Sequence, residues 1–257
     1  MSTAVRASAP VPVPAAGTAS FVAITPHRAF EDIAGQIRAL VADGRLKPGD
    51  RLPPERELAA QFHVSRNTLR EALRALELAG MIESRKGAAG GAFVRPGSGK
   101  VVVGGLRDLY HLGAITPEHL TEARIWLSTL VVRVACERAT EEDLAALEAN
   151  VAAAMRADEA GDFDERQRLH REFHLILAQA TRNPIVAITM EGVMEVLGHF
   201  IARIGPRENP FTLPSRRRFL KHLRARDAEA AAAEMTRFLE RMQQGYLAQW
   251  KDQAPRA

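Results

Sequence analysis

The chain has 257 residues, with 35 lysines and arginines against 31 aspartates and glutamates, which gives a net charge of +4 at pH 7. This length is enough for two domains with separate cores, and the charge is too small for a protein that coats DNA without regard to sequence. The single cysteine, Cys136, cannot form an intrachain disulfide, which suits a cytoplasmic location. No apolar run approaches the length that spans a membrane, so we expect no membrane partner.

Residues 1–24 consist mostly of Ala, Pro, Val, Ser and Thr, with Arg6 as their one charged side chain. Pro10, Pro12 and Pro14 interrupt any apolar segment that a signal peptide would need. Such a composition cannot bury enough apolar surface to fold, and it predicts a disordered tail. The first folded domain is therefore expected over residues 25–95.

Residues 30–80 predict three helices, of which the last two meet at a tight turn. The first helix carries an apolar stripe that ends before Gly44, and glycine commonly terminates helices. Pro53 and Pro54 open a second helix, since proline fits a first turn. The hydroxyl of Ser65 can cap a third helix. The inward stripe of that third helix consists of Leu69, Ala72, Leu73, Leu76 and Ala79.

The third helix presents arginines on the face opposite its apolar stripe. Arg66, Arg70 and Arg74 recur every four residues, and the alternating segments 81–85 and 92–95 predict a hairpin around a glycine-rich turn. Three helices followed by a two-stranded wing form a winged helix-turn-helix, whose third helix enters the DNA major groove. A small helical domain with a solvated charged face is the alternative. The joint order of turn, cap, arginine face and wing favours the DNA-binding interpretation.

Two runs in this region, LKPGDRLPPERELA and VSRNTLREALRALELAG, carry a long and specific resemblance. The segment from Ile24 to Val94 resembles the N-terminal domain of the GntR family of bacterial transcription regulators. The resemblance implies that double-stranded operator DNA contacts Arg56, Ser65, Arg66, Asn67, Thr68, Arg70, Lys86 and Gly87. The chemistry agrees, because arginine can bind guanine through two hydrogen bonds and a capped helix start favours phosphate. The wing is longer and richer in glycine than the shortest family versions.

After the wing, Pro96–Lys100 is rich in residues that interrupt helices, and residues 96–105 predict a flexible linker. Residues 106–250 are helical in pattern throughout, with caps at Thr116 and Thr140. A helix that begins at Pro184 is apolar on nearly every side and is expected at the buried centre. Residues 251–257 predict a second disordered tail. The expected fold class is therefore mainly α, with a winged helix-turn-helix joined to a six- or seven-helix all-α bundle.

The helical half resembles the C-terminal FCD domain of the FadR-like branch of GntR regulators. The matching features are EAR at 122–124, HREFH at 170–174, the Asn183-Pro184 pair, and RRRFLKHLRARDAEAAAAEM toward the end. This match is looser than that of the first domain. It implies that the bundle binds a small-molecule effector and joins two chains into a homodimer.

Five polar residues are candidates for effector binding because their positions place them on the inner faces of the predicted helices or at a helix start. These residues are Arg124, His170, His174, Asn183 and Arg216. Burying an arginine is costly unless it is paired, and the guanidinium fork suits a carboxylate. The predicted effector is therefore an organic acid.

Each candidate also has a purely structural interpretation. Arg124 could pair with Glu191 or Glu195 in the core. The two histidines could donate to backbone carbonyls inside the bundle, and Arg216 could belong to a solvated basic face with its two neighbours. The Asn183 side chain could cap the helix that follows it.

The resemblance raises the question of a divalent cation, because many FCD domains hold one with one Asp and three His. His170 stands at the position of the Asp, and His174 matches the second ligand. The third and fourth ligands align with Arg216 and Phe238, which cannot bind a cation. We therefore expect no metal cofactor; Zn, Ni or Mn is disfavoured and would have to use His170 and His174.

The sequence predicts a sequence-specific transcription regulator that binds an inverted-repeat operator as a dimer and responds to a carboxylate metabolite. We expect repression rather than activation, because repression is the more common role in the family that the sequence resembles. The main alternative is a regulator without an effector, whose bundle serves only dimerisation. We expect no enzyme, because a hydrolase built on His170 and His174 would lack a third ligand, a general base and a nucleophile motif.

Overall fold

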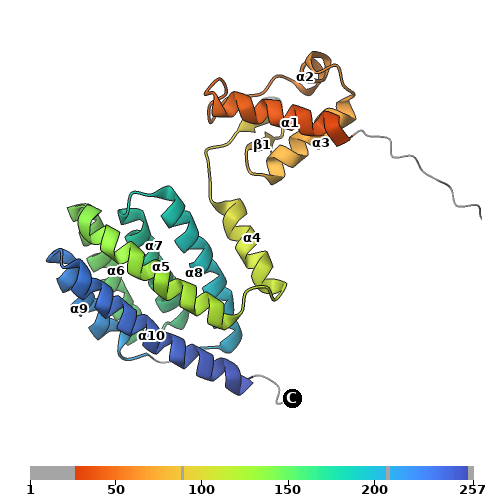
Figure 1. The fold of residues 1–257 in the computed structure, drawn as a ribbon. Helices are drawn as coiled ribbons and strands as arrows, with labels where there is room; N and C mark the ends of the chain where they lie inside the picture. The colour runs from red at the N-terminus through yellow and green to blue at the C-terminus, as the bar shows by residue number, and fades with distance from the viewer. Residues whose placement is uncertain (1–26, 88–89, 207–208, 254–257) are drawn as a thin grey trace, which may run out of the picture. The chain divides into compact units, whose positions relative to one another are not determined.

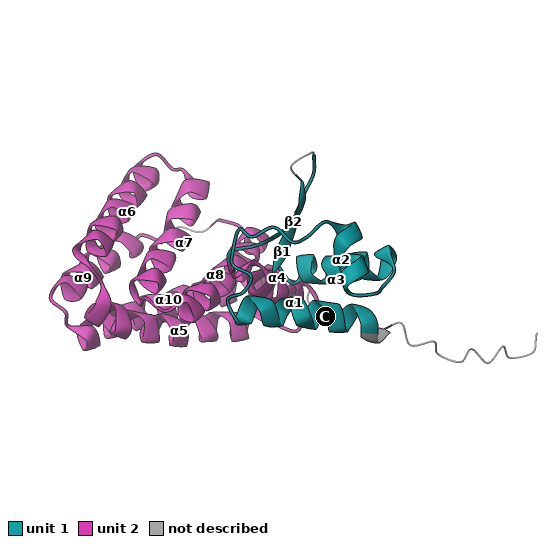
Figure 2. Cartoon of the chain, turned by 90° about the horizontal axis from the view of Figure 1, so that it is seen from above, with its two compact units in different colours: residues 1–96 teal, residues 97–257 magenta. Residues whose placement is uncertain are grey.

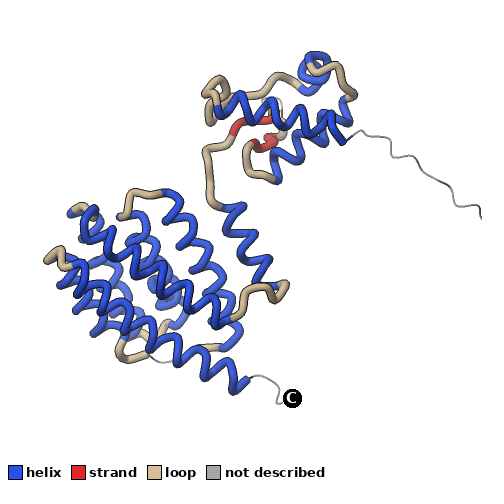
Figure 3. Tube along the Cα trace, in the orientation of Figure 1, coloured by secondary structure: helices blue, strands red, loops and turns tan. Residues whose placement is uncertain are grey.

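The structure is a computed structural model that describes residues 27–87, 90–206 and 209–253. The predicted tail at residues 1–24 lies outside the described residues. The chain forms two compact units, residues 1–96 and residues 97–257 (Figure 2). Each unit has its own apolar core, and helices dominate both of them (Figure 3).

In residues 27–87 and 90–96, the first unit contains three helices and a hairpin. The helices are α1 (His27–Ala42), α2 (Glu55–Gln61) and α3 (Arg66–Leu78), and the strands are β1 (Ile82–Arg85) and β2 (Gly91–Val94). The strands pair antiparallel with Ile82 opposite Val94, and both of these side chains are buried. The core is completed by apolar side chains of the three helices, among them Ile33, Ile37, Leu58, Leu69 and Leu76. The predicted winged helix-turn-helix is confirmed.

Local sequence explains where these helices begin and end. Gly44 and Gly80 follow α1 and α3 with φ angles of +69° and +72°, which glycine adopts without strain. The Ser65 hydroxyl accepts a hydrogen bond from the Thr68 amide at 3.1 Å and caps α3. Pro54 is the residue before α2 rather than part of it, so this helix begins at Glu55, after the two prolines that the sequence analysis places at its start.

Within the described residues the second unit is a bundle of seven helices, where the sequence predicts six or seven (Figure 1). They are α4 (Lys100–His111), α5 (Pro117–Arg138), α6 (Glu141–Glu159), α7 (Phe163–Ala180), α8 (Pro184–Ile204), α9 (Thr212–Arg224) and α10 (Ala228–Gln253). Thr116 caps α5 through the His119 amide, and Thr140 and Asp143 form the expected capping box at the start of α6. The closest helix pairings are α5 with α10, α6 with α7, and α4 with α8.

Two predicted boundaries differ from the structure. Helix α4 begins at Lys100, inside the predicted linker 96–105, and α10 runs to Gln253, past the predicted start of the tail at residue 251. Gly104 and Gly105 lower the helix propensity of α4. Packing against α8 offsets that loss, because Gly192 leaves room for the Leu106 side chain: a Cβ there would lie 2.5 Å from it.

Helix α8 corrects another expectation. It has 21 residues and contains an 18-residue window with a mean hydropathy of 1.6, so it is long and apolar enough to cross a membrane by length and composition. The expectation from the sequence that no apolar segment approaches the length needed to span a membrane is therefore wrong for α8. The helix contacts α4, α5, α7 and α10, and Met190, Leu197 and Phe200 are fully buried in the bundle. These contacts identify α8 as the core helix that the sequence predicts. The core helix of a globular protein can be as long and as apolar as a helix that crosses a membrane.

Candidate DNA interface and effector site

The first turn of α3 presents the predicted DNA-binding residues to solvent. Ser65, Arg66, Asn67 and Arg70 are exposed, as is Arg56 on α2. Thr68 is half-buried, since its hydroxyl lies 2.9 Å from that of Ser65 and is drawn into the cap. The side chains that can reach base edges and the free amides of a helix start thus lie together, which is the arrangement that groove-binding helices use.

Glu55 of α2 orients two of these arginines. Its carboxylate accepts a hydrogen bond from Arg70 Nε at 2.8 Å and lies 3.9 Å from Arg66 Nη2. All three side chains are more than one-third exposed, so each ion pair contributes at most about 1 kcal/mol to stability. The pairing therefore positions the guanidinium groups more than it stabilises the fold.

The wing has a supporting residue that the sequence analysis missed. The Arg51 guanidinium donates to the Gly90 carbonyl, and Arg51 pairs with Phe93 as an isolated bridge that extends the hairpin. Lys86 and Gly87 are exposed near the end of the wing, where Gly87 has a φ of +104°. The sequence offered one indication of this role, because Arg51 lies in an extended segment just before Pro53. Its partner Gly90, however, is distant in the sequence, so the contact itself could not be predicted locally.

In the second unit, four predicted residues from three helices meet in the core. Arg124 of α5, His170 and His174 of α7, and Arg216 of α9 have exposed fractions of only 2%, 9%, 1% and 4%. Arg124 Nη2 lies 2.6 Å from His170 Nε2 and 3.1 Å from His174 Nε2. Arg216 Nη2 lies 2.7 Å from His170 Nδ1. The His170 ring is thus held between two guanidinium groups, and we call these four residues the arginine-histidine cluster.

The remaining contacts of the cluster are with neutral groups. Arg216 donates to the Asn150 side-chain oxygen at 3.3 Å and lies 4.2 Å from the centroid of the Phe173 ring. Tyr246 hydrogen-bonds Arg124. Asn150 and Tyr246 were not predicted, although Asn150 stands on the apolar stripe of its helix, where a polar residue is a usable signal.

No acidic residue in the described ranges forms an ion pair with either buried arginine. The alternative in which Arg124 pairs with Glu191 or Glu195 does not hold, because Glu191 is exposed and Glu195 instead binds Arg171 at 3.0 Å. The Nε atoms of Arg124 and Arg216 are buried without a hydrogen-bond partner. Arg216 is not on a solvated face either, whereas its neighbour Arg217 is.

Burial and mutual repulsion set the charges in the cluster. Burial, and then the nearby Arg124 and Arg216, lower the pKa of His170 and His174 well below 6.5, so both rings are neutral at pH 7. Burial lowers the pKa of Arg124 to about 10 and, together with the charge of Arg124, lowers the pKa of Arg216 to about 9. Both guanidinium groups therefore stay charged at pH 7, and the cluster carries two positive charges.

We expect acidification below pH 6.5 to destabilise the second unit. The folded chain keeps His170 and His174 neutral, whereas the unfolded chain protonates both near pH 6.5. The unfolded state then binds more protons, so each histidine lowers the free energy of unfolding by about 1.4 kcal/mol per pH unit below that value. Thermal unfolding at several pH values measures the slope, which His174→Gln should reduce by about half. A melting temperature that does not change with pH would contradict neutral histidines.

His170 lines two cavities. One, of about 70 Å³, is lined by Arg216, Tyr246 and Met242 among others, and the second, of about 270 Å³, is lined mainly by α7 and α8. Phe163, Gln167 and His170 border both cavities. Arg124 borders neither of them, although it contacts the His170 ring that does. A ligand in either cavity could contact His170, and a ligand in the smaller cavity could also contact Arg216.

The cluster does not fit a divalent cation. Arg216 and Phe238, at the two aligned positions, both lie beside His170, at 2.7 Å for the guanidinium and 6.2 Å between ring centroids. The ring nitrogens that a cation would use are occupied by guanidinium N–H groups. A positive ion beside two buried guanidinium groups would be strongly repelled, and the described residues contain no group of three His, Cys, Asp or Glu side chains that could hold a metal.

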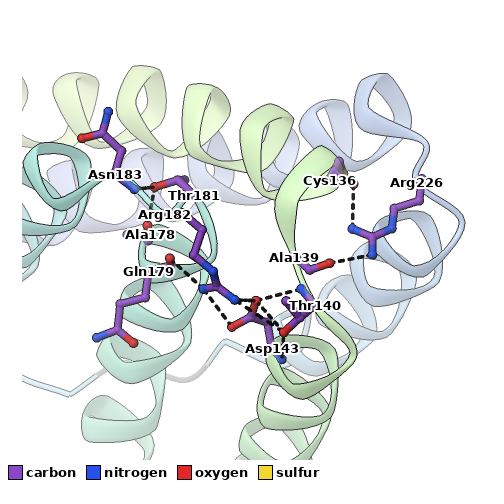
Figure 4. A network of polar contacts seen from close by, with 10 residues as sticks. All are labelled: Cys136, Ala139, Thr140, Asp143, Ala178, Gln179, Thr181, Arg182, Asn183 and Arg226. Atoms are coloured by element: carbon purple, nitrogen blue, oxygen red, sulfur yellow. Dashed lines mark hydrogen bonds and ion pairs between the residues drawn. The ribbon is translucent and has the colours of Figure 1, made fainter.

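Asn183 is not brought to the arginine-histidine cluster. Its side-chain oxygen accepts hydrogen bonds from the Ile185 and Val186 amides at 3.0 and 3.4 Å and caps α8. Figure 4 shows it at a helix junction beside Thr181 and Arg182, and the Arg182 guanidinium reaches Asp143. Of the two roles predicted for this residue, the structure supports capping.

Comparison with known proteins agrees with both units. The model for "Bacterial regulatory proteins, gntR family" matches residues 29–94, and the FCD domain model matches residues 119–241. A protein of Escherichia coli K12 named for regulation of the L-lactate dehydrogenase operon is 34% identical over 68% of this chain and 67% of its own length. The HTH-type transcriptional regulator YcbG of Bacillus subtilis, described as uncharacterized, is 30% identical over 82% of this chain and 86% of its own length.

Among solved structures, that of a GntR protein from Streptococcus agalactiae covers 84% of this chain and 99% of its own, with a TM-score of 0.66 and 24% identity. This likeness supports the fold. The two domain matches and the relatives are all transcription regulators rather than enzymes. The chain therefore belongs to the GntR family of DNA-binding transcription regulators, and its second unit is an FCD effector-binding domain.

Proposed function

We propose that this regulator is a cytoplasmic homodimeric repressor that binds an inverted-repeat operator and responds to a small carboxylate. The observation that supports the carboxylate is the arginine-histidine cluster, in which two buried guanidinium groups have no acidic partner among the described residues. An anion entering the adjacent cavities would compensate charge that the protein leaves uncompensated, and the guanidinium fork matches a carboxylate. The name of the E. coli relative also includes lactate, which is a carboxylate.

An exposed apolar stripe on α5 supports the dimer. Trp126 is 65% exposed and Leu130 follows it one turn later, also exposed. Large apolar side chains gathered on a surface are typical of protein interfaces. Two identical DNA-binding units would place their α3 helices in successive major grooves, which requires an inverted repeat. The alternative, a bundle that serves only dimerisation, leaves the buried charges and the cavities without a role.

Two experiments test the proposal: a ligand screen by thermal unfolding and a measurement of operator binding. Small carboxylic acids are screened for their effect on the melting temperature of the metal-free protein, and we expect one class to raise it, because a ligand at 100 times its Kd stabilises by about 2.7 kcal/mol. The same acid should weaken binding to the chain's operator, at a stoichiometry of two chains per inverted repeat. Stabilisation by divalent metals alone, or no response to any acid, would refute the carboxylate effector.

A further inference from the structure

A groove of about 400 Å³ lies between α3 and the wing, within the first unit. Among the residues that line it, only Arg70 belongs to the predicted DNA contacts. Its charged residues are four arginines and two glutamates, which give it a net charge of +2: Arg51, Arg70, Arg74, Arg85, Glu55 and Glu77. The groove therefore favours an anionic occupant.

Both glutamates of the groove already have partners. Glu55 accepts a hydrogen bond from Arg70 Nε at 2.8 Å. Glu77 accepts hydrogen bonds from the amide and the hydroxyl of Ser84, at 2.9 and 3.2 Å, and so ties α3 to β1. The side chain of Arg74, by contrast, has no hydrogen-bond or ion-pair partner among the described residues. An anion that enters the groove would meet a guanidinium group that no carboxylate compensates.

The wall opposite α3 holds a second arginine in a fixed place. The segment before α2 is hydrogen-bonded to the wing, where the Leu52 amide donates to the Ala92 carbonyl at 2.8 Å. The Arg51 guanidinium donates to the Gly90 carbonyl. Glycine at position 91 leaves room for this side chain, because a Cβ there would lie 2.8 Å from Arg51 Nε. A guanidinium group has five N–H donors, so this one keeps others for an anion, and little freedom is lost when it binds one.

We propose that this groove holds the sugar-phosphate backbone of one DNA strand, with Arg74 and Arg51 as its phosphate contacts. When the first turn of α3 lies in a major groove and Lys86 of the wing reaches the neighbouring minor groove, the strand that divides the two grooves passes between α3 and the wing. That strand carries one negative charge at each nucleotide. Such contacts set the position of the duplex, and they carry no sequence information themselves.

The salt dependence of DNA binding by the full-length protein tests this inference, by fluorescence anisotropy on the operator and on a scrambled duplex. Each lost phosphate contact lowers the slope of log affinity against log salt by about 0.9. Arg74→Gln should therefore lower the slope by about 0.9 for each bound chain. Near 0.1 M salt it should weaken both duplexes about five- to tenfold per chain, and the ratio of the two affinities should stay the same.

Two further variants separate a phosphate contact from other roles of Arg74. Arg74→Lys keeps the charge and should keep most of the slope, whereas a two-bond contact with guanine would be lost with lysine. Arg38→Gln is the matched control, because Arg38 is an exposed arginine of the same unit that does not line the groove. Thermal unfolding of the three variants checks that none of them has lost its fold.

Operators with a single methylphosphonate, moved from one position to the next, locate the contacted phosphate. At the position that faces the groove, this neutral linkage should weaken binding by the unchanged protein and have little effect on Arg74→Gln, where the contact is already absent. An unchanged salt slope in Arg74→Gln, or the same methylphosphonate penalties in both proteins, would overturn the proposal. A loss of affinity confined to the operator would also overturn it, because it would assign Arg74 to base recognition.

Discussion

Arg66→Ala is expected to abolish the preference of this protein for its operator over unrelated DNA. Arg66 lies in the first turn of α3, beside the Ser65 cap, and its side chain is 61% exposed and 3.9 Å from its nearest acidic oxygen. A guanidinium so placed can bind guanine through two hydrogen bonds, and losing one such contact removes about 1–3 kcal/mol of discrimination. In a dimer the loss occurs at both half-sites, so operator affinity should fall by the square of the factor for one half-site.

Fluorescence anisotropy on the operator and on a scrambled duplex measures this effect. The ratio of the two affinities should approach one in the variant, while binding to the scrambled duplex changes little. Arg38→Ala is the matched control, because it removes the same charge from an exposed position on α1 of the same unit. If Arg66→Ala keeps the preference of the unchanged protein, α3 is not the element that contacts base edges through this residue.

The first unit was predictable because the features that define it are local. Caps, helix-stopping glycines and apolar stripes act within a few residues of each other, and the structure confirms the three helices and the wing. Arg51 could not be found this way, since its value depends on Gly90 and Phe93, far along the chain. The predicted linker was too long for the same reason, because α4 owes its first turns to contacts with α8.

The same difference between local features and contacts distant in sequence applies to the effector site. Helical spacing alone placed Arg124, His170 and His174 on inner faces, and all three are buried as expected. Spacing does not choose partners, so it could not decide between Glu195 and the imidazoles as the contacts of Arg124. Likewise, the hydropathy pattern shows that α8 is apolar, but it does not show which elements pack against this helix. Which side chains contact one another is decided only when the helices pack into the bundle.

Arg124→Met is expected to remove the ligand response while making the ligand-free protein more stable. Methionine fills similar space without charge, so it removes the desolvation penalty of a buried cation and its repulsion with Arg216. Against this stand the contacts of Arg124 with His170, His174 and Tyr246, which are all with neutral groups. Replacing buried charge with well-packed apolar groups stabilises by about 1–4 kcal/mol in favourable cases, and we expect a gain within that range.

Urea unfolding of the ligand-free variant measures this gain, and operator titration with and without the stabilising acid measures the response. Arg133→Met is the matched control on the same helix: Arg133 is exposed and binds Glu229 at 2.9 Å, so its loss should change stability little. A destabilised Arg124→Met would mean that the imidazole contacts outweigh the burial of the charge. A response to the acid that survives the substitution would place the effector elsewhere in the bundle. Gain of stability together with loss of response would show that Arg124 is retained for the ligand rather than for the fold.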